Sequence, residues 1–249
     1  MEYQDINAKT IDRWVEDGWE WGKPVSHEVY EKALKGEWDI VLTPCKTMPH
    51  TWLGDIRGKK LLGLACGGGQ QMPVFAALGA ECTVLDYSEK QLESERMVAA
   101  REGYGIRILR ADMTKPLPFE NGSFDIVVNP ISTCYVRKVK PIYREAARVL
   151  RPGGILVCAF DSVLNYIVDE NEERVVFPLP FDPVADEKAR KFLEDVDCGM
   201  QFSHTMEEHL SGLLEAGFTV TDFYGDTGNE GRLAEMNIET FYAARCIKK

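Results

Sequence analysis

The sequence has no long hydrophobic run, few histidines and an excess of acidic over basic side chains. No apolar stretch approaches the roughly 20 residues that a membrane-spanning helix needs, so we expect no membrane partner. Lys and Arg number 29 against 40 Asp and Glu, and the net charge of −11 disfavours broad nucleic-acid binding, which needs a positive surface. The four histidines form no cluster with cysteines, and we therefore expect no metal site.

The seven cysteines also lack the spacing of a disulfide framework or a Cys-x-x-Cys site. Their number is odd and most fall in or beside apparent strands, where a free thiol behaves as a small buried hydrophobe. The first ten residues are polar and include acids, unlike a secretory signal. Together these features favour the reducing cytoplasm. The length of 249 residues suits one α/β domain with additions, and nothing in the sequence indicates an oligomeric state.

Residues 61–69, Leu-Leu-Gly-Leu-Ala-Cys-Gly-Gly-Gly, predict a buried strand that turns through glycines into a helix. Glycines let a ligand approach the backbone closely, and the N–H groups at the start of a helix bind anionic ligands. A second apolar strand ends at Asp86, 19 residues after Gly67. At that spacing an acid at the end of a second strand meets a ribose hydroxyl of a nucleotide. Asp86 could instead cap the next helix, although Ser88 fits that role better.

From residue 59 onward, apolar strands alternate with helices, which predicts parallel strands joined by right-handed crossovers. The last two strands are joined without a clear crossover helix, so we expect that pair to be antiparallel. The predicted fold class is therefore α/β, a doubly wound Rossmann-like sheet of about seven strands, mostly parallel with the last strand antiparallel. The expected strands are 61–64, 81–86, 106–109, 124–128, 155–160, one beginning at 217–220, and 240–247.

Two of the connecting helices carry clear local signals. Ser88 is a suitable N-cap for a charged amphipathic helix, and Thr205 followed three residues later by Glu208 is a capping box. The expected inward positions are Leu92, Met97 and Val98 in the first helix, and Leu210, Leu213 and Leu214 in the second.

The glycine-rich turn and the segments after it resemble class I S-adenosylmethionine-dependent methyltransferases. Cys66, Gly67 and Gly69 match the family's first motif, usually DLGCGTG, whereas Gly63 replaces its leading acid and Ala65 its first glycine. The resemblance covers roughly residues 58–160, because three later motifs follow in the family's order. These are RADM at 110–113, LPFENGSFDIVV at 117–128 and RVLRPGGILV at 148–157.

The resemblance implies S-adenosyl-L-methionine as the cofactor and methyl transfer as the reaction. By the same resemblance, Asp86 binds the ribose, whereas Asp112 and the backbone of Met113 bind the adenine. Asn129 opens an Asn-Pro segment at the exit of the fourth strand, where methyl donor and acceptor meet. The residues expected to contact the cofactor are Gly63, Ala65, Cys66, Gly67, Asp86, Tyr87, Asp112, Met113 and Asn129.

Two further segments are expected to surround the acceptor. Residues 1–57 form a helical arm that carries all five tryptophans, ahead of a methyltransferase domain at 58–249, and residues 161–203 interrupt the alternation as an insertion. Either segment could be a lid over the pocket, and either could simply pack on the surface. Trp14 and Trp21 are the lid candidates. We expect a small-molecule acceptor, because the chain is acidic and its arm is aromatic.

The catalytic residue is unknown from the sequence. A sulfonium methyl group is already a strong electrophile, so positioning the acceptor supplies much of the catalysis. An oxygen or protonated-amine acceptor would benefit from a base, for which His27 and Tyr135 are candidates. Two other functions stay open: an NAD-dependent oxidoreductase, although the turn lacks the G-x-G-x-x-G pattern, and a non-catalytic S-adenosylmethionine-binding sensor.

Overall fold

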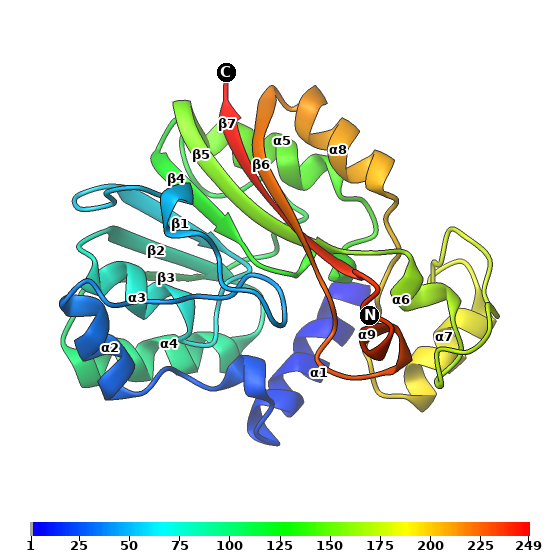
Figure 1. Cartoon of the computed structure of the whole chain (residues 1–249). Coiled ribbons are helices and arrows are strands. Elements are labelled where there is room, and N and C mark those ends of the chain that lie inside the picture. The colour runs from blue at the N-terminus through cyan, green and yellow to red at the C-terminus, as the bar shows by residue number, and fades with distance from the viewer. Residues whose placement is uncertain (1) are drawn as a thin grey trace.

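The computed structural model describes residues 2–249 and shows a central sheet with helices on both faces (Figure 1). Seven strands lie in the order β3-β2-β1-β4-β5-β7-β6. Strands β1 to β5 pair in parallel, and β7 runs antiparallel to both of its neighbours, β5 and β6. The predicted α/β class, the number of strands and the reversed last strand are confirmed. The bounds are β1 Lys60–Leu64, β2 Glu81–Asp86, β3 Arg107–Arg110, β4 Phe124–Asn129, β5 Leu150–Asp161, β6 Phe218–Asp226 and β7 Phe241–Lys248.

Two hydrophobic cores form, one on each face of the sheet, because successive strand residues point to opposite faces. Leu61 packs in one core and Leu62 in the other. Helices α2, α3 and α4 cover the first face, whereas α5 and α8 cover the second. The helices are α1 Tyr3–Glu16, α2 His27–Leu34, α3 Gln71–Ala77, α4 Glu89–Glu102, α5 Lys140–Val149, α6 Leu164–Ile167, α7 Glu187–Asp195, α8 Met206–Glu215 and α9 Arg232–Glu235, with single 3-10 turns at Glu20–Gly22, His50–Trp52 and Thr133–Tyr135.

The predicted caps are present, but one inward position in each of the two capped helices is wrong. The Ser88 side chain accepts from the backbone of α4, and Thr205 and Glu208 form the reciprocal capping box of α8. Met97 is 54% exposed and Leu214 is 59% exposed. In α4 the buried positions include the polar Ser94 and Glu95, because the arm and the glycine-rich turn cover that side of the helix.

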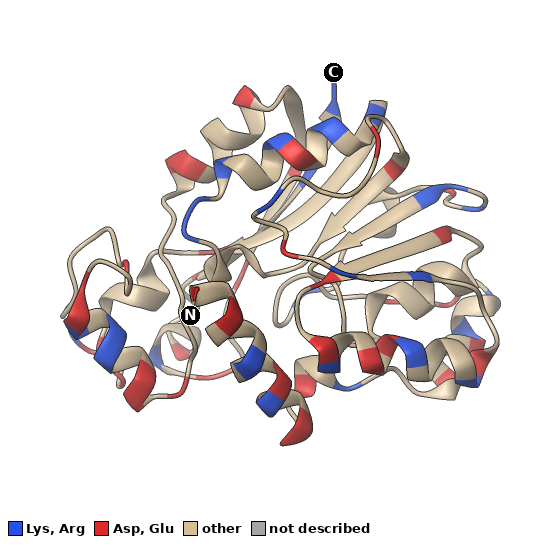
Figure 2. Cartoon of the chain, turned by 180° about the vertical axis from the view of Figure 1, so that it is seen from behind, with Lys and Arg blue, Asp and Glu red and all other residues tan. Residues whose placement is uncertain are grey.

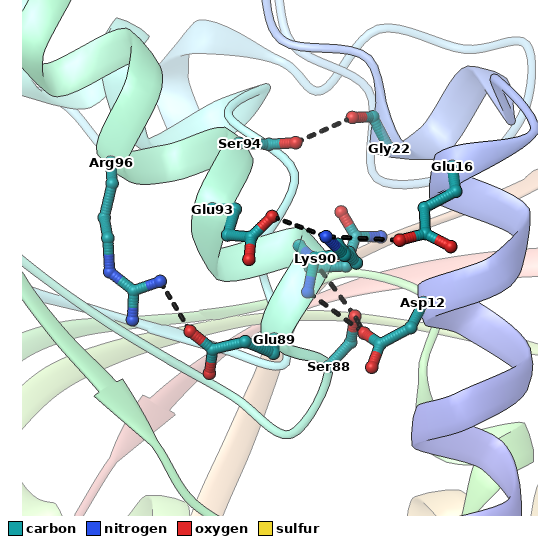
Figure 3. A network of polar contacts seen from close by, with 10 residues as sticks. Asp12, Glu16, Gly22, Ser88, Glu89, Lys90, Glu93, Ser94 and Arg96 are labelled. Carbon is teal, nitrogen blue, oxygen red and sulfur yellow. Dashed lines mark hydrogen bonds and ion pairs between the residues drawn. The ribbon is translucent and has the colours of Figure 1, made fainter.

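The arm is attached to the first turn of α4 by polar contacts (Figure 3). The Asp12 carboxylate in α1 accepts from the Ser88 hydroxyl at 2.6 Å and from the backbone N–H of Lys90 at 3.0 Å. The Lys90 ammonium also pairs with Glu16 at 3.2 Å. An acid at the start of a helix interacts favourably with its partial positive charge. These contacts therefore hold α1 beside the carboxyl end of β2.

The arm also contacts the insertion, which carries α6 and α7. Asn7 is buried; its amide group donates to the carbonyl of Met200 at 2.9 Å, and its side-chain oxygen accepts from the N–H of the same residue at 2.6 Å. The Arg13 guanidinium makes a bidentate pair with Asp197. The insertion packs against the turn after β4 in a small third core, made of Cys134, Tyr166, Phe177, Phe181, Ala189 and Leu193.

Charged side chains are spread over the helices and loops, with few on the strands (Figure 2). Acidic and basic residues are interspersed along α4 and α7, and three pairs form within these helices: Lys90 with Glu93, Arg96 with Glu89, and Lys191 with Asp195. Within residues 2–249 no helix combines the length and the apolar character needed to cross a bilayer.

Candidate active site

Three residues of the glycine-rich turn after β1 have a positive φ, the backbone conformation that glycine favours. Gly68 and Gly69 have φ of +98° and +71°, and Ala65 has φ of +47°. Ala65 stands where the resembled motif has a glycine, so this chain places a methyl group and a strained backbone at that point. Gly63 has a different reason for being glycine. A Cβ there would lie 2.5 Å from the Met72 sulfur and 2.9 Å from the Cys66 Cβ, so a side chain at the position of the resembled family's acid would force these neighbours to shift.

A buried carboxyl group accepts a hydrogen bond from the backbone of the glycine turn. Glu95 in α4 is 0% exposed, and its Oε1 accepts from the backbone N–H of Gly69 at 2.7 Å. Burial raises the pKa of Glu95 to about 8, although the Gly69 hydrogen bond acts in the opposite direction. The sequence pattern did not single out Glu95, because it lies within a run of charged residues on α4. Only its contact with the turn identifies it.

Asp86 ends β2 directly opposite the glycine turn. Its Oδ2 accepts from the N–H of Gly67 and its Oδ1 from the N–H of Ser88, both at 3.0 Å. Burial raises the pKa of Asp86, and the N–H groups of Ser88, Gly67 and Tyr87 counter that effect. A Cβ on Gly67 would lie 3.0 Å from Asp86 Oδ2. Glycine is therefore required at position 67 for the turn to contact the acid.

One cleft with two lobes opens at the carboxyl ends of β1, β2 and β4, where open α/β sheets bind ligands. The two lobes share six lining residues, namely Trp19, Ala65, Asp86, Gln91, Ile131 and Tyr135. The first lobe lies between α1 and the ends of β2 and β3. The second lobe encloses about 310 Å³ and extends toward β5 and the insertion. That volume lies at the lower end of the range for small-molecule sites.

The first lobe brings together five of the predicted cofactor residues: Ala65, Asp86, Tyr87, Asp112 and Met113. Asp112 is fixed by accepting from the N–H of Thr114 at 2.8 Å. The Tyr87 hydroxyl donates to Asp5 of the arm at 2.9 Å. Residues Gln4, Asn7, Ala8 and Ile11 of α1 form the opposite wall. The arm thus forms part of the lobe itself.

Three other predicted cofactor residues lie outside the lining of both lobes. Gly63 faces Met72, and the Cys66 side chain is buried and contacts Gln71. Asn129 is 1% exposed, and its amide group donates to the carbonyl of Leu64 at 2.7 Å and to the Ser132 hydroxyl at 2.8 Å. Their side chains therefore support the residues of the site without lining the cleft. The cleft is lined instead by Ala65 and Gly67, and by Pro130 and Ile131 after Asn129.

The four predicted acceptor-site residues separate into two groups. Trp21 lines the second lobe and Tyr135 lines both. Trp14 instead donates to Asp197 at 3.3 Å, and its ring packs on Trp19 with centroids 5.2 Å apart. Trp19, which the sequence did not distinguish from its neighbours, is the arm tryptophan that lines both lobes.

The structure corrects the suggestion that His27 accepts a proton from the acceptor. His27 lies at the exposed start of α2, where its Nδ1 contacts Glu102 at 2.8 Å. The Glu102 carboxylate raises the pKa of His27. His27 lines neither lobe, so it is a surface ion-pair residue. No sequence signal separates that role from a catalytic one.

Comparison with known proteins identifies the family. The sequence profile of a family described as "Methyltransferase domain" matches residues 62–158. A relative named "Uncharacterized methyltransferase YbaJ" from Bacillus subtilis (strain 168) is 40% identical over 250 residues, which is 97% of each chain. This chain belongs to the S-adenosylmethionine-dependent methyltransferases. Methyl transfer from S-adenosylmethionine is therefore its activity, in place of NAD-dependent oxidation or a sensor role.

Solved structures share the methyltransferase fold. An S-adenosylmethionine-dependent methyltransferase from Mesorhizobium loti superposes with a TM-score of 0.64 at 22% identity, covering 80% of this chain and 94% of that one. A geranyl diphosphate C-methyltransferase from Streptomyces coelicolor A3(2), solved with S-adenosyl-L-homocysteine, gives 0.58 at 15% identity and covers 80% and 73%. At these identities the likeness concerns the fold alone.

The methyltransferase site is built from backbone, carboxylate and apolar groups. Among residues 2–249 no group of three or more His, Cys, Asp or Glu side chains is arranged to hold a metal ion. The pair of carboxylates at the strand ends, Asp86 and Asp112, suits the hydroxyl and amino groups of a nucleoside as hydrogen-bond donors. The chain's own residues therefore fit the adenosine part of the cofactor.

Proposed function

We propose that this methyltransferase binds the adenosine part of its cofactor in the first lobe and methylates a small, partly apolar molecule in the second. The observation that carries the proposal is that the two lobes are adjacent and share the lining residues Ala65 and Asp86 beside the glycine turn. In this proposal Asp86 binds the ribose, and Asp112 with the Met113 backbone binds the adenine. Tyr87, Gly67 and the turn complete the cofactor site.

The acceptor proposal rests on the lining of the second lobe. Most of its residues are apolar or aromatic, and they include Trp21, Val41, Leu42, Pro130, Ile131 and Phe241. Apolar lining with a few polar groups is typical of sites for small molecules. The net charge of −11 agrees with a small molecule rather than a nucleic acid as the acceptor.

We further propose that the arm, residues 1–57, and the insertion, residues 161–203, close together over the bound molecules. The hydrogen bonds between Asn7 and Met200 and the ion pair between Arg13 and Asp197 link the two segments to each other. All seven cysteines are free thiols. Free thiols are consistent with a protein that functions in the reducing cytoplasm.

Calorimetric titration with S-adenosylhomocysteine tests the cofactor site. Asp86→Asn removes a charged hydrogen-bond acceptor, so we expect affinity to fall by about 1.5–3 kcal/mol, or roughly 10- to 150-fold. Asp125→Asn is the matched control, because Asp125 lies near the start of β4, away from the carboxyl ends of the strands where the cleft lies, and accepts from the backbone N–H of Lys60. Equal affinity in wild type and Asp86→Asn would reject the ribose assignment.

A further inference from the structure

Asp161 brings a carboxylate into the second lobe that the sequence motifs did not reveal. It is the last residue of β5, and it lines this lobe together with Cys134, Tyr135 and Asn165. Its backbone pairs with Phe241 of β7. The strand therefore fixes the position of the side chain, as a catalytic group requires.

The two oxygens of Asp161 have different environments. The Tyr166 hydroxyl donates to Oδ2, whereas Oδ1 has no hydrogen-bond partner within the described part of the chain. The residue is only 5% exposed. A buried acceptor without a partner costs free energy, and native proteins seldom leave one unless it has a function. The Tyr166 bond holds the carboxylate in one orientation, so Oδ1 is the oxygen that lacks a donor.

The surroundings of Asp161 increase its affinity for a proton. Burial raises the pKa of Asp161 to about 6, although the Tyr166 and Asn165 side chains favour the charged form. The titratable groups that face it are Tyr166, Cys134, Tyr135 and Tyr143, and burial raises the pKa of each of these as well. Asp161 is thus ionised at neutral pH among neutral neighbours, and binds a proton more tightly than an ordinary aspartate.

The rest of the second lobe favours a neutral donor. Its lining includes the uncharged polar side chains of Thr43, Asn165 and Gln201, and its other carboxylate is Asp86, which it shares with the first lobe. Moving a charged ammonium group into such an apolar space costs more than moving a hydroxyl group. A hydroxyl group can also give both a hydrogen bond and, on reaction, a proton.

We propose that Asp161 is a catalytic residue, whose Oδ1 accepts a hydrogen bond and then the proton from the hydroxyl group of a phenol-like acceptor. This inference rests on the proposed function, because it places the acceptor in the second lobe. Tyr166 is a positioning residue, which acts through Oδ2.

The step conserves atoms and charge. The acceptor oxygen forms a bond to the methyl carbon, and the carbon–sulfur bond breaks with both electrons left on sulfur. The hydroxyl proton moves to Asp161 Oδ1. The positive charge of the sulfonium and the negative charge of the carboxylate disappear together, so no net charge is left in the apolar lobe.

Binding of phenol and of anisole, its methyl ether, tests the hydrogen bond. In wild type we expect phenol to bind at least fivefold more tightly than anisole, and in Asp161→Ala, which has no side-chain acceptor, we expect less than twofold. The binding is followed through the ¹³C carboxyl resonance of Asp161, which the variant identifies by its absence, and by calorimetry. Equal binding of the two probes, no binding of phenol, or a preference that survives in the variant would each overturn the proposal.

Two controls define what a failure means. The titrations are made with and without S-adenosylhomocysteine. If the wild-type protein prefers phenol over anisole but does not bind S-adenosylhomocysteine, the proposed cofactor site is rejected and the role of Asp161 is not. A tenfold loss of S-adenosylhomocysteine affinity in Asp161→Asn would assign Asp161 to the cofactor and overturn its acceptor role. Tighter binding of benzylamine than of phenol would overturn the hydroxyl class.

Conversion of phenol to anisole tests the proton transfer. We expect Asp161→Asn to slow anisole formation at least 100-fold, a typical effect of losing a general base. The wild-type rate should rise with pH toward a plateau above the Asp161 pKa of about 6. Tyr166→Phe removes the bond that favours the charged carboxylate, so its rise should move to higher pH. Failure of wild type to methylate bound phenol, or identical pH profiles in all three proteins, would overturn the base role.

Discussion

Glu95→Gln is a sharp test of the physical account of the glycine turn. Glu95 accepts from the Gly69 N–H at 2.7 Å through Oε1, and within the described residues its Oε2 has no hydrogen-bond partner. Glutamine keeps the shape of the side chain and the acceptor for Gly69. It cannot ionise, and it carries an amide NH2 group in place of Oε2. Any difference between the two proteins that depends on pH therefore reports the charge on Glu95.

The sign and size follow from the raised pKa. Burial raises the pKa of Glu95 from the ordinary 4.5 to about 8. A carboxyl group with a higher pKa in the folded state holds its proton more tightly when folded. Its contribution to stability is complete below pH 4.5 and is lost as pH rises through 8. The difference in pKa corresponds to about 5 kcal/mol in the free energy of unfolding.

Urea unfolding of wild type and Glu95→Gln between pH 4 and pH 9, followed by tryptophan fluorescence, measures this loss. Relative to the variant, wild type should lose stability steadily across that range, and Glu95→Gln should be the more stable protein at pH 9. Glu93→Gln is the matched control, since Glu93 lies on the same helix with its side chain 52% exposed. Parallel curves for wild type and Glu95→Gln would refute a buried, neutral Glu95.

Three other substitutions test the arm. Trp21→Ala should raise the KM for the acceptor and change S-adenosylhomocysteine affinity little, because Trp21 lines only the second lobe; a loss confined to stability would show that it only packs. Asn7→Ala leaves the Met200 N–H and carbonyl without partners, so urea unfolding should show a loss of about 1–3 kcal/mol and limited proteolysis should cut the arm faster; unchanged cleavage would contradict a link between the arm and the insertion. His27→Ala should leave S-adenosylhomocysteine affinity within twofold by calorimetry, since His27 pairs with Glu102 outside the cleft, and a tenfold loss would contradict that placement.

Much of the fold could be predicted because its signals are local. A strand buried on both faces is apolar along its length, and a cap or a turn needs particular residues at particular steps. The strand over Glu81–Asp86 and the capping box of Thr205 and Glu208 were therefore predicted as they occur. Met97 and Leu214 were wrongly placed inside because hydrophobicity alone does not tell which side of a helix another segment covers.

In the candidate site, too, the features with local sequence signals could be predicted, whereas those that depend on tertiary packing could not. The sequence alone determined the order of the motifs, the turn at Gly67 and the acid at the end of β2, since each is a short run of neighbours in the chain. Only the tertiary structure decided that Asn129 points back to Leu64, that Glu95 lies behind Gly69, and that Asp161 lies in the second lobe. These roles depend on burial and on partners from distant segments. The protonation state of a side chain and its hydrogen bonds depend on the segments that pack against it in the folded protein. The residues next to it in the sequence do not determine them.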